Sequence, residues 1–383
     1  MALIPVLVAA LLAGALVYSA LTVFAAHHYL GTRPSRSLAG PAVSILKPLA
    51  GAEAGLERNL RSFFEQDYHD FELLFAVREA SDAAAGVVEE LRREYPKIHA
   101  RLIVTGEPPY ANAKVYSLDR MMAEASHDLL VMSDSDIRVT PDMLQVVAAE
   151  FEDAHLGLAT CPYRAVPGPS RGRSGGSFWS VLEALGMNTE FLGGILVARI
   201  VEGMKFAVGP TIVARRAALA SIGGLDRVKD YLAEDFVLGK FVAESGWRVS
   251  LSSYVIEHHI GSQGFRANAR HRLRWVRSTR RSRPAGYVGQ VFTNPIPLAL
   301  LLVASDASWW PVLIATALVR ALAAWAVAGW VLHDSLTARR WYLLPVQDLL
   351  SFAFWVAGFF GNTVQWRGRT YDLLADGRFK LKH

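Results

Sequence analysis

Two aspartates separated by one residue, Asp134 and Asp136, are the first candidates for chemistry in this sequence. They follow a short apolar run at residues 129–132, which is typical of a buried parallel strand. Ligands of open α/β sheets bind outside the carboxyl ends of the strands, where two carboxylates could hold a divalent cation and, through it, a diphosphate. In the alternative interpretation they belong to a polar turn before a helix, with Thr140 as its N-cap and Pro141 at its first position.

Two further polar side chains are expected near the same edge. Asp82 follows a strand predicted at residues 71–77, and it could accept hydrogen bonds from a nucleobase N–H or from ribose hydroxyls. Capping of the helix that begins near Ala83 would explain Asp82 equally well. Lys114 lies with Asn112 in a loop that could return to this edge and present an ammonium group to a phosphate. The alternative is that Lys114 is a surface lysine.

A second acidic pair, Glu234 and Asp235, stands at the start of a predicted helix whose apolar residues recur at helical spacing. Acidic residues at a helix N-terminus are stabilised by the helix dipole, which explains one of the two without a catalytic role. Beside a diphosphate site, Asp235 could act as a general base toward an acceptor hydroxyl. Because Glu234 is acidic too, position in the sequence does not decide which carboxylate acts.

Eight arginines lie between residues 266 and 283, just before the C-terminal apolar region. Four recur at spacings of four, three and four residues, which places them on one face of a helix: Arg270, Arg274, Arg277 and Arg281. Guanidinium groups suit bidentate contact with a diphosphate, and the adjacent Trp275 offers an amphipathic ring. The alternative is an interfacial helix that binds anionic lipid headgroups. Nucleic acid is a weaker candidate, because apolar segments flank the domain.

Histidines and cysteine give little support for a zinc site. His258, His259 and His271 have no fixed ligand spacing to a further residue, so we interpret them as structural. The single cysteine, Cys161, excludes an intramolecular disulfide framework and a cysteine-based zinc cluster. Its neighbours predict a buried small hydrophobic side chain.

Residues 42–261 alternate between predicted strands and helices, the pattern of a parallel sheet covered by helices on both faces. The predicted strands are residues 43–49, 71–77, 100–105 and 129–132, and the predicted helices are residues 56–65, 83–95 and a helix ending at 124. This is an α/β fold of the mononucleotide-binding type, in which we expect the third and fourth strands to lie on either side of the candidate site.

Two later segments carry open alternatives. Residues 162–177 are rich in Pro, Gly and Ser and include three arginines, which predicts a mobile loop. Such a loop either closes over a bound nucleotide or is an inert surface excursion. Residues 178–200 are helical in tendency and apolar, so they either receive a lipid tail or pack in the core.

The chain is too apolar for an ordinary soluble protein, with 52% hydrophobic residues and a mean hydropathy of +0.23. Residues 2–26 form an uncharged apolar run long enough to cross a hydrocarbon core of about 30 Å. No basic segment precedes this run and no small-residue cleavage site follows it, which favours an anchor over a signal peptide. Arg33, Arg36 and Lys47 follow the run, and the positive-inside rule then predicts a cytoplasmic domain.

Three apolar segments follow the arginine-rich region, at residues 288–304, 309–332 and 341–363. Arg320 and Asp348 lie inside the second and third, where we expect them either to pair or to face a groove that admits lipid. Three full crossings would put the basic tail at residues 367–382 on the outer side, contrary to the positive-inside rule. We therefore expect one segment not to cross completely.

The order of these residues resembles a known family. The combination consists of Asp82, Asp134-Ser135-Asp136, Glu234-Asp235 and Arg274-Trp275. It resembles the lipid-directed and processive glycosyltransferases of families 2 and 21, which have the GT-A fold and the motifs D, DxD, (E/T)D and (Q/R)xxRW. The resemblance covers about residues 41–285. The local sequence is most similar to the ceramide glucosyltransferase family in four segments: VSILKPL, SDSDIRV, YLAEDF and GWRV. Hopanoid-directed glycosyltransferases are close relatives of that family.

The resemblance implies a role for each matching position. Asp82 would contact the uracil of a UDP-sugar, Asp134 the ribose or a metal ion, and Asp136 the Mg²⁺ or Mn²⁺ that bridges the diphosphate. Asp235 would be the base, with Glu234 beside it. Arg274 would stabilise the departing UDP, and Trp275 would help to position the acceptor, while Lys114 is retained as a nucleotide-sugar contact. The chain departs from the pattern at His271, so either His271 binds the diphosphate or Arg270 or Arg272 takes over that task.

The implied protein is an inverting, multi-pass membrane glycosyltransferase with its catalytic domain in the cytoplasm. It would move glucose from UDP-glucose to the primary hydroxyl of ceramide or a similar lipid. Transfer of GlcNAc from UDP-GlcNAc to a hopanoid or polyprenyl-phosphate lipid is the alternative within enzymes, and a scaffold that binds anionic lipid is the alternative outside them. The expected divisions are an anchor at residues 1–30, a GT-A domain at 41–285, a membrane region at 286–366 and a basic tail at 367–383.

Overall fold

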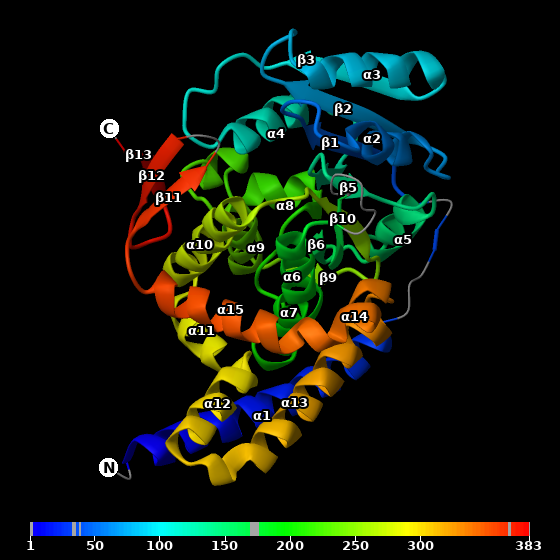
Figure 1. The fold of residues 1–383 in the computed structure, drawn as a ribbon. Coiled ribbons are helices and arrows are strands. Elements are labelled where there is room, and N and C mark those ends of the chain that lie inside the picture. Colours follow the sequence, from blue (N-terminus) through cyan, green and yellow to red (C-terminus); the bar gives the residue numbers. More distant parts are fainter. Residues whose placement is uncertain (1–2, 33–35, 38–39, 169–175, 367–368, 383) are drawn as a thin grey trace.

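A seven-stranded sheet lies at the centre of the α/β region in the computed structural model, which describes residues 3–32, 36–37, 40–168, 176–366 and 369–382 (Figure 1). Its strands are β1 (Val43–Pro48), β2 (Phe71–Val77), β3 (His99–Val104), β4 (Leu129–Ser133), β6 (Leu156–Thr160), β8 (Thr211–Arg215) and β9 (Arg248–Leu251). The order is β3-β2-β1-β4-β8-β6-β9, and only β8 runs antiparallel to its neighbours. The predicted α/β fold with a mostly parallel sheet is confirmed.

The strand order corrects one expectation. Strand β4, which ends at the two aspartates, lies between β1 and β8, while β3 forms the edge of the sheet. The third strand therefore does not flank the candidate site. Sequence periodicity identifies strands but carries no information on which strands pair, because pairing depends on contacts between distant segments.

Helices cover both faces of the sheet because successive strand residues point to opposite sides. Ile45 of β1 belongs to one apolar core and its neighbour Leu46 to the other. The first core includes α2 (Leu56–Phe64), α3 (Ala83–Glu94) and α5 (Met143–Glu150), and the second includes α4 (Ala113–Glu124), α8 (Arg216–Ser221) and α9 (Glu234–Glu244). Cys161 is fully buried in the first core, as predicted.

A small second sheet begins directly after the aspartates. It has the order β5-β10-β7, from β5 (Ile137–Arg138), β10 (Ile256–Ile260) and β7 (Tyr163–Pro167). The turn at residues 134–136 therefore connects two sheets, and helix α5 begins only at Met143 with Asp142 at its N-cap position. The alternative of a helix cap at Thr140 is wrong. Strand β7 also occupies the start of the predicted loop at 162–177, of which residues 169–175 lie outside the described residues.

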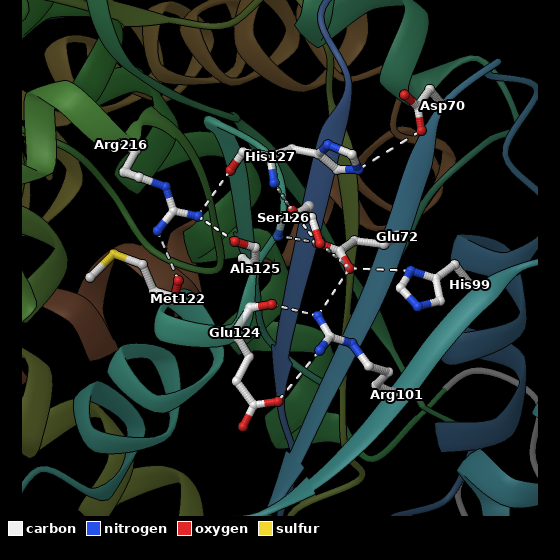
Figure 2. Close-up of polar contacts among 11 residues, drawn as sticks. Asp70, Glu72, His99, Arg101, Met122, Glu124, Ala125, Ser126, His127 and Arg216 are labelled. Atoms are coloured by element: carbon white, nitrogen blue, oxygen red, sulfur yellow. Dashed lines mark hydrogen bonds and ion pairs between the residues drawn. The ribbon is translucent and has the colours of Figure 1, made fainter.

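The opposite, amino-terminal edge of the large sheet is fixed around a buried carboxylate. Glu72 of β2 accepts hydrogen bonds from the Ser44 hydroxyl at 2.7 Å and the Ser126 amide at 2.6 Å. Its second oxygen lies 3.1 Å from Arg101 and 3.3 Å from His99. Figure 2 shows His99 and Arg101 of β3 and Ser126 of the loop before β4 converging on Glu72 of β2. One side chain thus joins β1, β2, β3 and the segment before β4.

A long helix separates the sheet from the apolar helices. It consists of α6 (Phe178–Gly186), a π-helical turn (Met187–Phe191) and α7 (Leu192–Val201). This helix is long and apolar enough to cross a membrane, but 83% of its most apolar 18-residue stretch is buried in the protein. The alternative of core packing therefore describes this segment. Helix α10 (Phe265–Ser282) follows β10 and leads into the C-terminal region.

The remaining helices are α1 (Leu3–Leu30), α11 (Pro284–Gly289), α12 (Pro295–Ser305), α13 (Trp310–Trp325), α14 (Ser335–Arg340) and α15 (Leu344–Gly358). Of these, α1, α12 and α13 extend away from the sheet, whereas α14 and α15 lie close to the α/β region (Figure 1). Among the described residues, three helices could cross a membrane by length and composition: Leu3–Leu30, Phe178–Val201 and Ala307–Val331. A fourth is possible if Pro284–Phe292 and Pro295–Ser305, bent by 55°, count as one span. Helix α15 has 15 residues and a length of about 22 Å, which is short of a hydrocarbon core of about 30 Å.

Two charges inside the apolar region pair with each other, as one of the two alternatives predicted. Arg320 of α13 and Asp348 of α15 are both buried, and Arg320 Nε lies 3.0 Å from an Asp348 oxygen. Arg320 also donates to the Thr189 hydroxyl in the π-helical turn at 3.1 Å. The pair therefore joins α15 to α13, and Arg320 joins both to the long helix. Breaking the pair would be costly, because it would leave an uncompensated buried charge.

The chain ends in a third sheet, formed by β11 (Thr363–Trp366), β12 (Arg369–Leu373) and β13 (Phe379–Leu381). It packs beside the α/β region rather than beside the tips of α1, α12 and α13 (Figure 1). The expected basic tail, apart from residues 367–368 and 383, is therefore structured within this sheet.

Replacement of Glu72 by Gln should lower the free energy of unfolding at pH 7 by about 1–3 kcal/mol, because the amide carries no charge and places a donor NH2 where the second carboxylate oxygen accepts from Arg101. Although burial opposes ionisation, the Ser126 amide, the Ser44 hydroxyl and Arg101 hold the pKa of Glu72 below its ordinary value. A lowered pKa stabilises the fold above the unfolded-state pKa, and this contribution is lost as pH falls through the folded-state pKa.

The stability gap between wild type and Glu72→Gln should consequently narrow as pH falls below about 4.5. Denaturant unfolding of the detergent-solubilised protein from pH 7 to pH 3 measures it. Glu124→Gln is the matched control, since the exposed Glu124 carboxylate contacts the same Arg101. A gap independent of pH would contradict this account of Glu72.

Candidate active site

The turn that carries Asp134 and Asp136 is held on both sides by backbone hydrogen bonds. The Asp134 amide donates to the Pro210 carbonyl at 2.9 Å, and the His259 amide donates to the Asp136 carbonyl at 2.8 Å. The first contact joins the turn to the segment before β8, and the second joins it to β10. Both aspartates therefore lie at the carboxyl end of β4, as the sequence predicted.

Lys114 reaches this turn from the first residues of α4, whose N-cap is Asn112. Its Nζ lies 2.7 Å from Asp134 Oδ1 and 3.2 Å from Glu234 Oε1. Burial alone would lower the pKa of Lys114, but the carboxylates of Asp134 and Glu234 raise it well above its ordinary value. Burial in turn raises the pKa of Glu234, although Lys114 opposes this shift. The loop thus returns to the sheet edge, and the surface-lysine alternative is wrong.

Asp235 lies in the same pocket as Lys114 and Glu234. Its two oxygens accept hydrogen bonds from backbone amides, at 2.5 Å from Gly209 and 2.8 Å from Phe236. Gly209 adjoins Pro210, whose carbonyl binds the Asp134 amide, so one short segment aligns both acidic sites. This arrangement fixes the Asp235 carboxylate without using a cation, whereas Glu234 is paired with Lys114.

Sequence reasoning missed a second lysine. Lys47, near the end of β1, is completely buried below the turn and donates to the Asp134 carbonyl at 2.7 Å. Its ammonium lies 3.6 Å from the centroid of the Phe63 ring. Burial lowers the pKa of Lys47 to about 7, although Asp134 and Asp136 oppose this shift. A single lysine inside an otherwise apolar strand was the signal that could have identified it.

His258, which the sequence analysis interpreted as structural, contacts a candidate metal ligand. Its Nε2 lies 3.0 Å from Asp136 Oδ2, and its ring packs edge-on against Tyr163. Burial opposes ionisation of both groups, yet each partner favours the charged form of the other. The pKa of His258 is therefore raised and that of Asp136 is lowered. The pairing of β10 with β5, which no motif announces, brings these two residues together.

The donor set at the turn suits a cation that is shared with a ligand. No group of three or more His, Cys, Asp or Glu side chains within the described residues is arranged to hold a metal ion. Asp136 Oδ1 is nevertheless buried and has no hydrogen-bond partner within that part of the chain. Mg²⁺ and similar ions typically use one or two carboxylates and complete their shell with substrate phosphates and water. Asp136, with Asp134 two residues before it, fits this pattern.

Asp82 lies at the carboxyl end of β2, on the other side of β1 from the aspartate turn. Its side chain accepts hydrogen bonds from the Ala84 amide at 2.9 Å and from the Gly51 amide at 2.9 Å. The first contact is an N-cap of α3, so the capping alternative is correct. The second joins the loops after β1 and β2. These contacts leave the predicted role of Asp82 in nucleotide binding as a prediction.

Helix α10 positions the remaining candidates next to the long helix. His271 Nδ1 lies 2.6 Å from Glu183, and its ring centroid is 4.4 Å from that of Trp275. Trp275 in turn stacks on Phe191 at 6.3 Å, and Phe191 packs against Tyr163. A row of aromatic rings therefore leads from the His258–Asp136 pair to α10. Arg274 lies on the same helix between His271 and Trp275.

The two arginines considered as substitutes for His271 differ in their surroundings, since Arg272 is buried and Arg270 is exposed. Arg272 donates to Gln347 of α15 at 2.9 Å, while Arg270 Nε donates to the Arg266 carbonyl. Further along, Arg277 donates to the Thr363 carbonyl and Arg281 donates to the Asn362 side chain. Two arginines of the basic face of α10, Arg277 and Arg281, thus bind the segment at residues 362–363.

The whole chain resembles proteins of one family. A family model described as Glycosyl transferase family 21 matches residues 6–379. Ceramide glucosyltransferase 1 of Caenorhabditis elegans is 29% identical over 235 residues, which are 61% of this chain and 48% of that protein. Ceramide glucosyltransferase 3 of the same organism is 26% identical over 349 residues, which are 88% of this chain and 74% of that protein. The chain thus matches about half the length of the first of these relatives.

A solved structure has the same fold. It is the mannosyltransferase PcManGT of Pyrobaculum calidifontis in complex with GDP-Man and Mn²⁺. The similarity covers 93% of this chain and 98% of that one at 18% identity, with a TM-score of 0.53. At this identity the comparison concerns the fold alone, and the predicted GT-A fold is confirmed.

Asp82→Ala should lower the free energy of unfolding by about 1 kcal/mol, because the cap of α3 and the acceptor for the Gly51 amide are both lost. Asp82→Asn keeps an acceptor oxygen and should remain close to wild type. Thermal unfolding compares the two variants. Equal loss of stability in both variants would contradict the capping role. A separate measurement of UDP binding tests the nucleotide role, since weaker binding by Asp82→Asn than by wild type would indicate that the carboxylate contacts the nucleotide.

Proposed function

Because this chain belongs to glycosyl transferase family 21, we propose that it is a membrane-bound enzyme that transfers glucose from UDP-glucose to a lipid hydroxyl. The acceptor is the primary hydroxyl of ceramide or a similar lipid. The observation that carries the proposal is the ion cluster in which Lys114 joins Asp134 to Glu234 beside Asp235. The cluster offers carboxylates for a cation, an ammonium for a phosphate and a carboxylate for a proton, which are the needs of transfer from a nucleoside diphosphate sugar.

The donor binds across the carboxyl ends of β2, β1 and β4. Asp82 contacts the uracil and Asp134 the ribose or the cation, and Asp136, whose Oδ1 has no hydrogen-bond partner among the described residues, would hold Mg²⁺ or Mn²⁺. Lys114 contacts a phosphate and stays protonated, since its pKa is raised. The bound cation would neutralise charge that develops on the departing diphosphate. Lys47 supports the turn from below through the Asp134 carbonyl.

Asp235 accepts the proton of the acceptor hydroxyl. As that proton moves to the carboxylate, the hydroxyl oxygen forms a bond to the anomeric carbon on the face opposite UDP, and the bond from this carbon to the diphosphate breaks. The configuration inverts and the product is a β-glucosyl lipid. Glu234 is less suited to this task, because its carboxylate is paired with Lys114.

Helix α10 completes the site on the acceptor side. Arg274 and His271 contact the diphosphate, and Trp275 positions the acceptor. The proposal is supported by the contact of His271 with Glu183 and by the stacking of Trp275 on Phe191, which fix both rings next to the long helix. The ring of Trp275 gives a lipid an apolar surface close to the polar reaction centre.

The enzyme is a multi-pass membrane protein with its catalytic domain on the cytoplasmic side. Helices α1, α12 and α13 form the membrane region, while α15 lies at the interface because it is short. The catalytic domain spans residues 41–285 and follows an anchor at 1–30. The membrane region begins at 286, and β11 (Thr363–Trp366), which the sequence placed at the end of the region 286–366, belongs with the tail at 367–383. Its partners are a UDP-sugar, a membrane lipid acceptor and the membrane, and not nucleic acid.

Donor and acceptor can be identified with purified protein in nanodiscs. UDP-glucose and UDP-GlcNAc, each labelled in the sugar, are supplied with ceramide, a hopanoid or a polyprenyl phosphate in the presence of Mg²⁺ or Mn²⁺. We expect labelled glucosylceramide as the main product. Labelled hopanoid or polyprenyl lipid from UDP-GlcNAc would favour the alternative enzyme, and no product with any pair would leave only the lipid-binding scaffold. Asp136→Ala should abolish transfer and should have no effect on a scaffold.

Asp235→Asn should reduce kcat by at least about 100-fold while UDP binding is retained, because the amide cannot accept the hydroxyl proton. Glu234→Gln is the informative control, because it loses the partner of Lys114. We expect Glu234→Gln chiefly to raise the KM for UDP-glucose. Initial rates and UDP binding by calorimetry separate the two effects. Near-normal turnover of Asp235→Asn would exclude it as the base.

A further inference from the structure

The C-terminal sheet, β11–β13, contacts each of the three segments that carry the candidate active-site residues. The first is the loop before α9. The Phe379 amide of β13 donates to the Asp230 carbonyl at 2.9 Å, and Tyr231 forms an isolated antiparallel bridge with Arg378. Leu232 packs against the apolar cluster of the sheet. These contacts end two residues before Glu234, so the sheet holds the approach to the acidic pair.

The second segment is the loop before α4. Ala111 packs against the same apolar cluster, whose buried members are Val364, Tyr371, Leu373 and Phe379. The neighbouring Asn112 is fully buried and acts in two directions. Its Nδ2 donates to the Tyr231 carbonyl at 3.0 Å, and its Oδ1 accepts from the Val115 amide as the N-cap of α4. The start of α4, and with it Lys114, is therefore tied to the loop that β13 holds.

The third segment is α10. Arg277 donates to the Thr363 carbonyl of β11 at 2.7 Å, and Arg280 donates to the Gly361 carbonyl at 2.8 Å. At the other end of the sheet, a Cβ on Gly377 would lie 3.2 Å from the Ser282 hydroxyl, which shows how closely the turn before β13 approaches α10. The arginines that follow Arg274 and Trp275 on α10 are thus attached to the C-terminal sheet.

We infer that the C-terminal sheet is the positioning element of the donor site: it sets Lys114, the Glu234–Asp235 pair and α10 relative to one another. This inference rests on the proposed function for its kinetic consequences. The contact between Lys114 and Glu234 joins α4 to α9. The loops before these two helices are held by two further contacts, since Asn112 binds the Tyr231 carbonyl and β13 binds the Asp230 carbonyl. A displacement of about 1 Å in the side chains that these loops position can lower the catalytic rate by about 100-fold. A sheet that only added stability would lower the unfolding temperature and leave the kinetic constants alone.

Phe379 is the best residue with which to test the inference. Its ring is buried and packs against Tyr371 at 5.1 Å and Trp366 at 5.8 Å, while its amide holds Asp230. Leu381, on the same strand, is the matched control because its side chain is 39% exposed. Phe379→Leu refills most of the volume and serves as the conservative rescue variant.

The experiment compares wild type, Phe379→Ala, Phe379→Leu and Leu381→Ala as full-length proteins in nanodiscs. Backbone amide hydrogen exchange is followed in residues 108–116 and 228–236, and kcat and KM are measured for UDP-glucose at saturating ceramide. In Phe379→Ala we expect faster exchange in both segments at a temperature where the protein is folded, and a KM raised by about tenfold or more. Phe379→Leu should recover most of both effects, and Leu381→Ala should match wild type.

Arg277→Gln provides a second test if Phe379→Ala does not fold. It removes the hydrogen bond from α10 to the Thr363 carbonyl of β11 without altering the apolar cluster, and it should raise the KM for UDP-glucose and speed exchange in residues 272–282. Unchanged exchange and KM in a folded Phe379→Ala, or in Arg277→Gln, would overturn the inference. If the wild-type protein transfers no sugar, the proposed function fails, whereas the exchange measurements still decide whether the sheet holds the two loops.

Discussion

The ammonium group of Lys114 is the charge on which the arrangement of the site depends. It lies between two largely buried carboxylates from distant parts of the chain, Asp134 after β4 and Glu234 at the start of α9. Two carboxylates at one sheet edge repel each other, and a cation between them offsets that repulsion. Lys114 also opposes the rise in the pKa of Glu234 that burial causes. Because Lys114 is carried by α4, the same contact also sets the distance between three elements before a ligand binds.

Local sequence patterns identified the first four strands of the large sheet, the three helices between them and the sheet edge on which the aspartates lie, but not β6, β8, β9 or the C-terminal sheet. Strand β2 matches its predicted limits, and the helix dipole and cap arguments led to the positions of Asp235 and Asp82. What the sequence could not supply was pairing. Asp136 contacts His258, which is 122 residues away in the sequence, because β5 pairs with β10. Neither strand contains a motif from which this pairing could be predicted. Lys47 was missed for a related reason, since burial of a lysine depends on the carbonyl and ring that surround it.

The α/β region and the apolar helices share buried polar contacts, so they do not behave as two independent bodies. The long helix is the common element, and a π-helical turn interrupts it where its side chains must face both regions. Its polar contacts include Glu183 with Asn268 and His271, Asn188 with Asp334, and Thr189 with Arg320. Hydrogen bonds in such surroundings are costly to leave unmade, which gives the interface one preferred geometry. Of the two alternatives for this helix, a lipid-binding surface and core packing, the second describes its role in joining the two regions.

The position of β11–β13 has a consequence for the biogenesis of the protein. These strands are synthesised after α1, α12, α13 and α15, yet they dock onto loops that were translated much earlier. A ribosome that has released only the α/β region has therefore made a sheet whose loops before α4 and α9 still lack their final contacts. In the proposed multi-pass topology, these loops gain their final contacts only after α12 and α13 have been inserted, because the last strands must reach them on the same side of the bilayer.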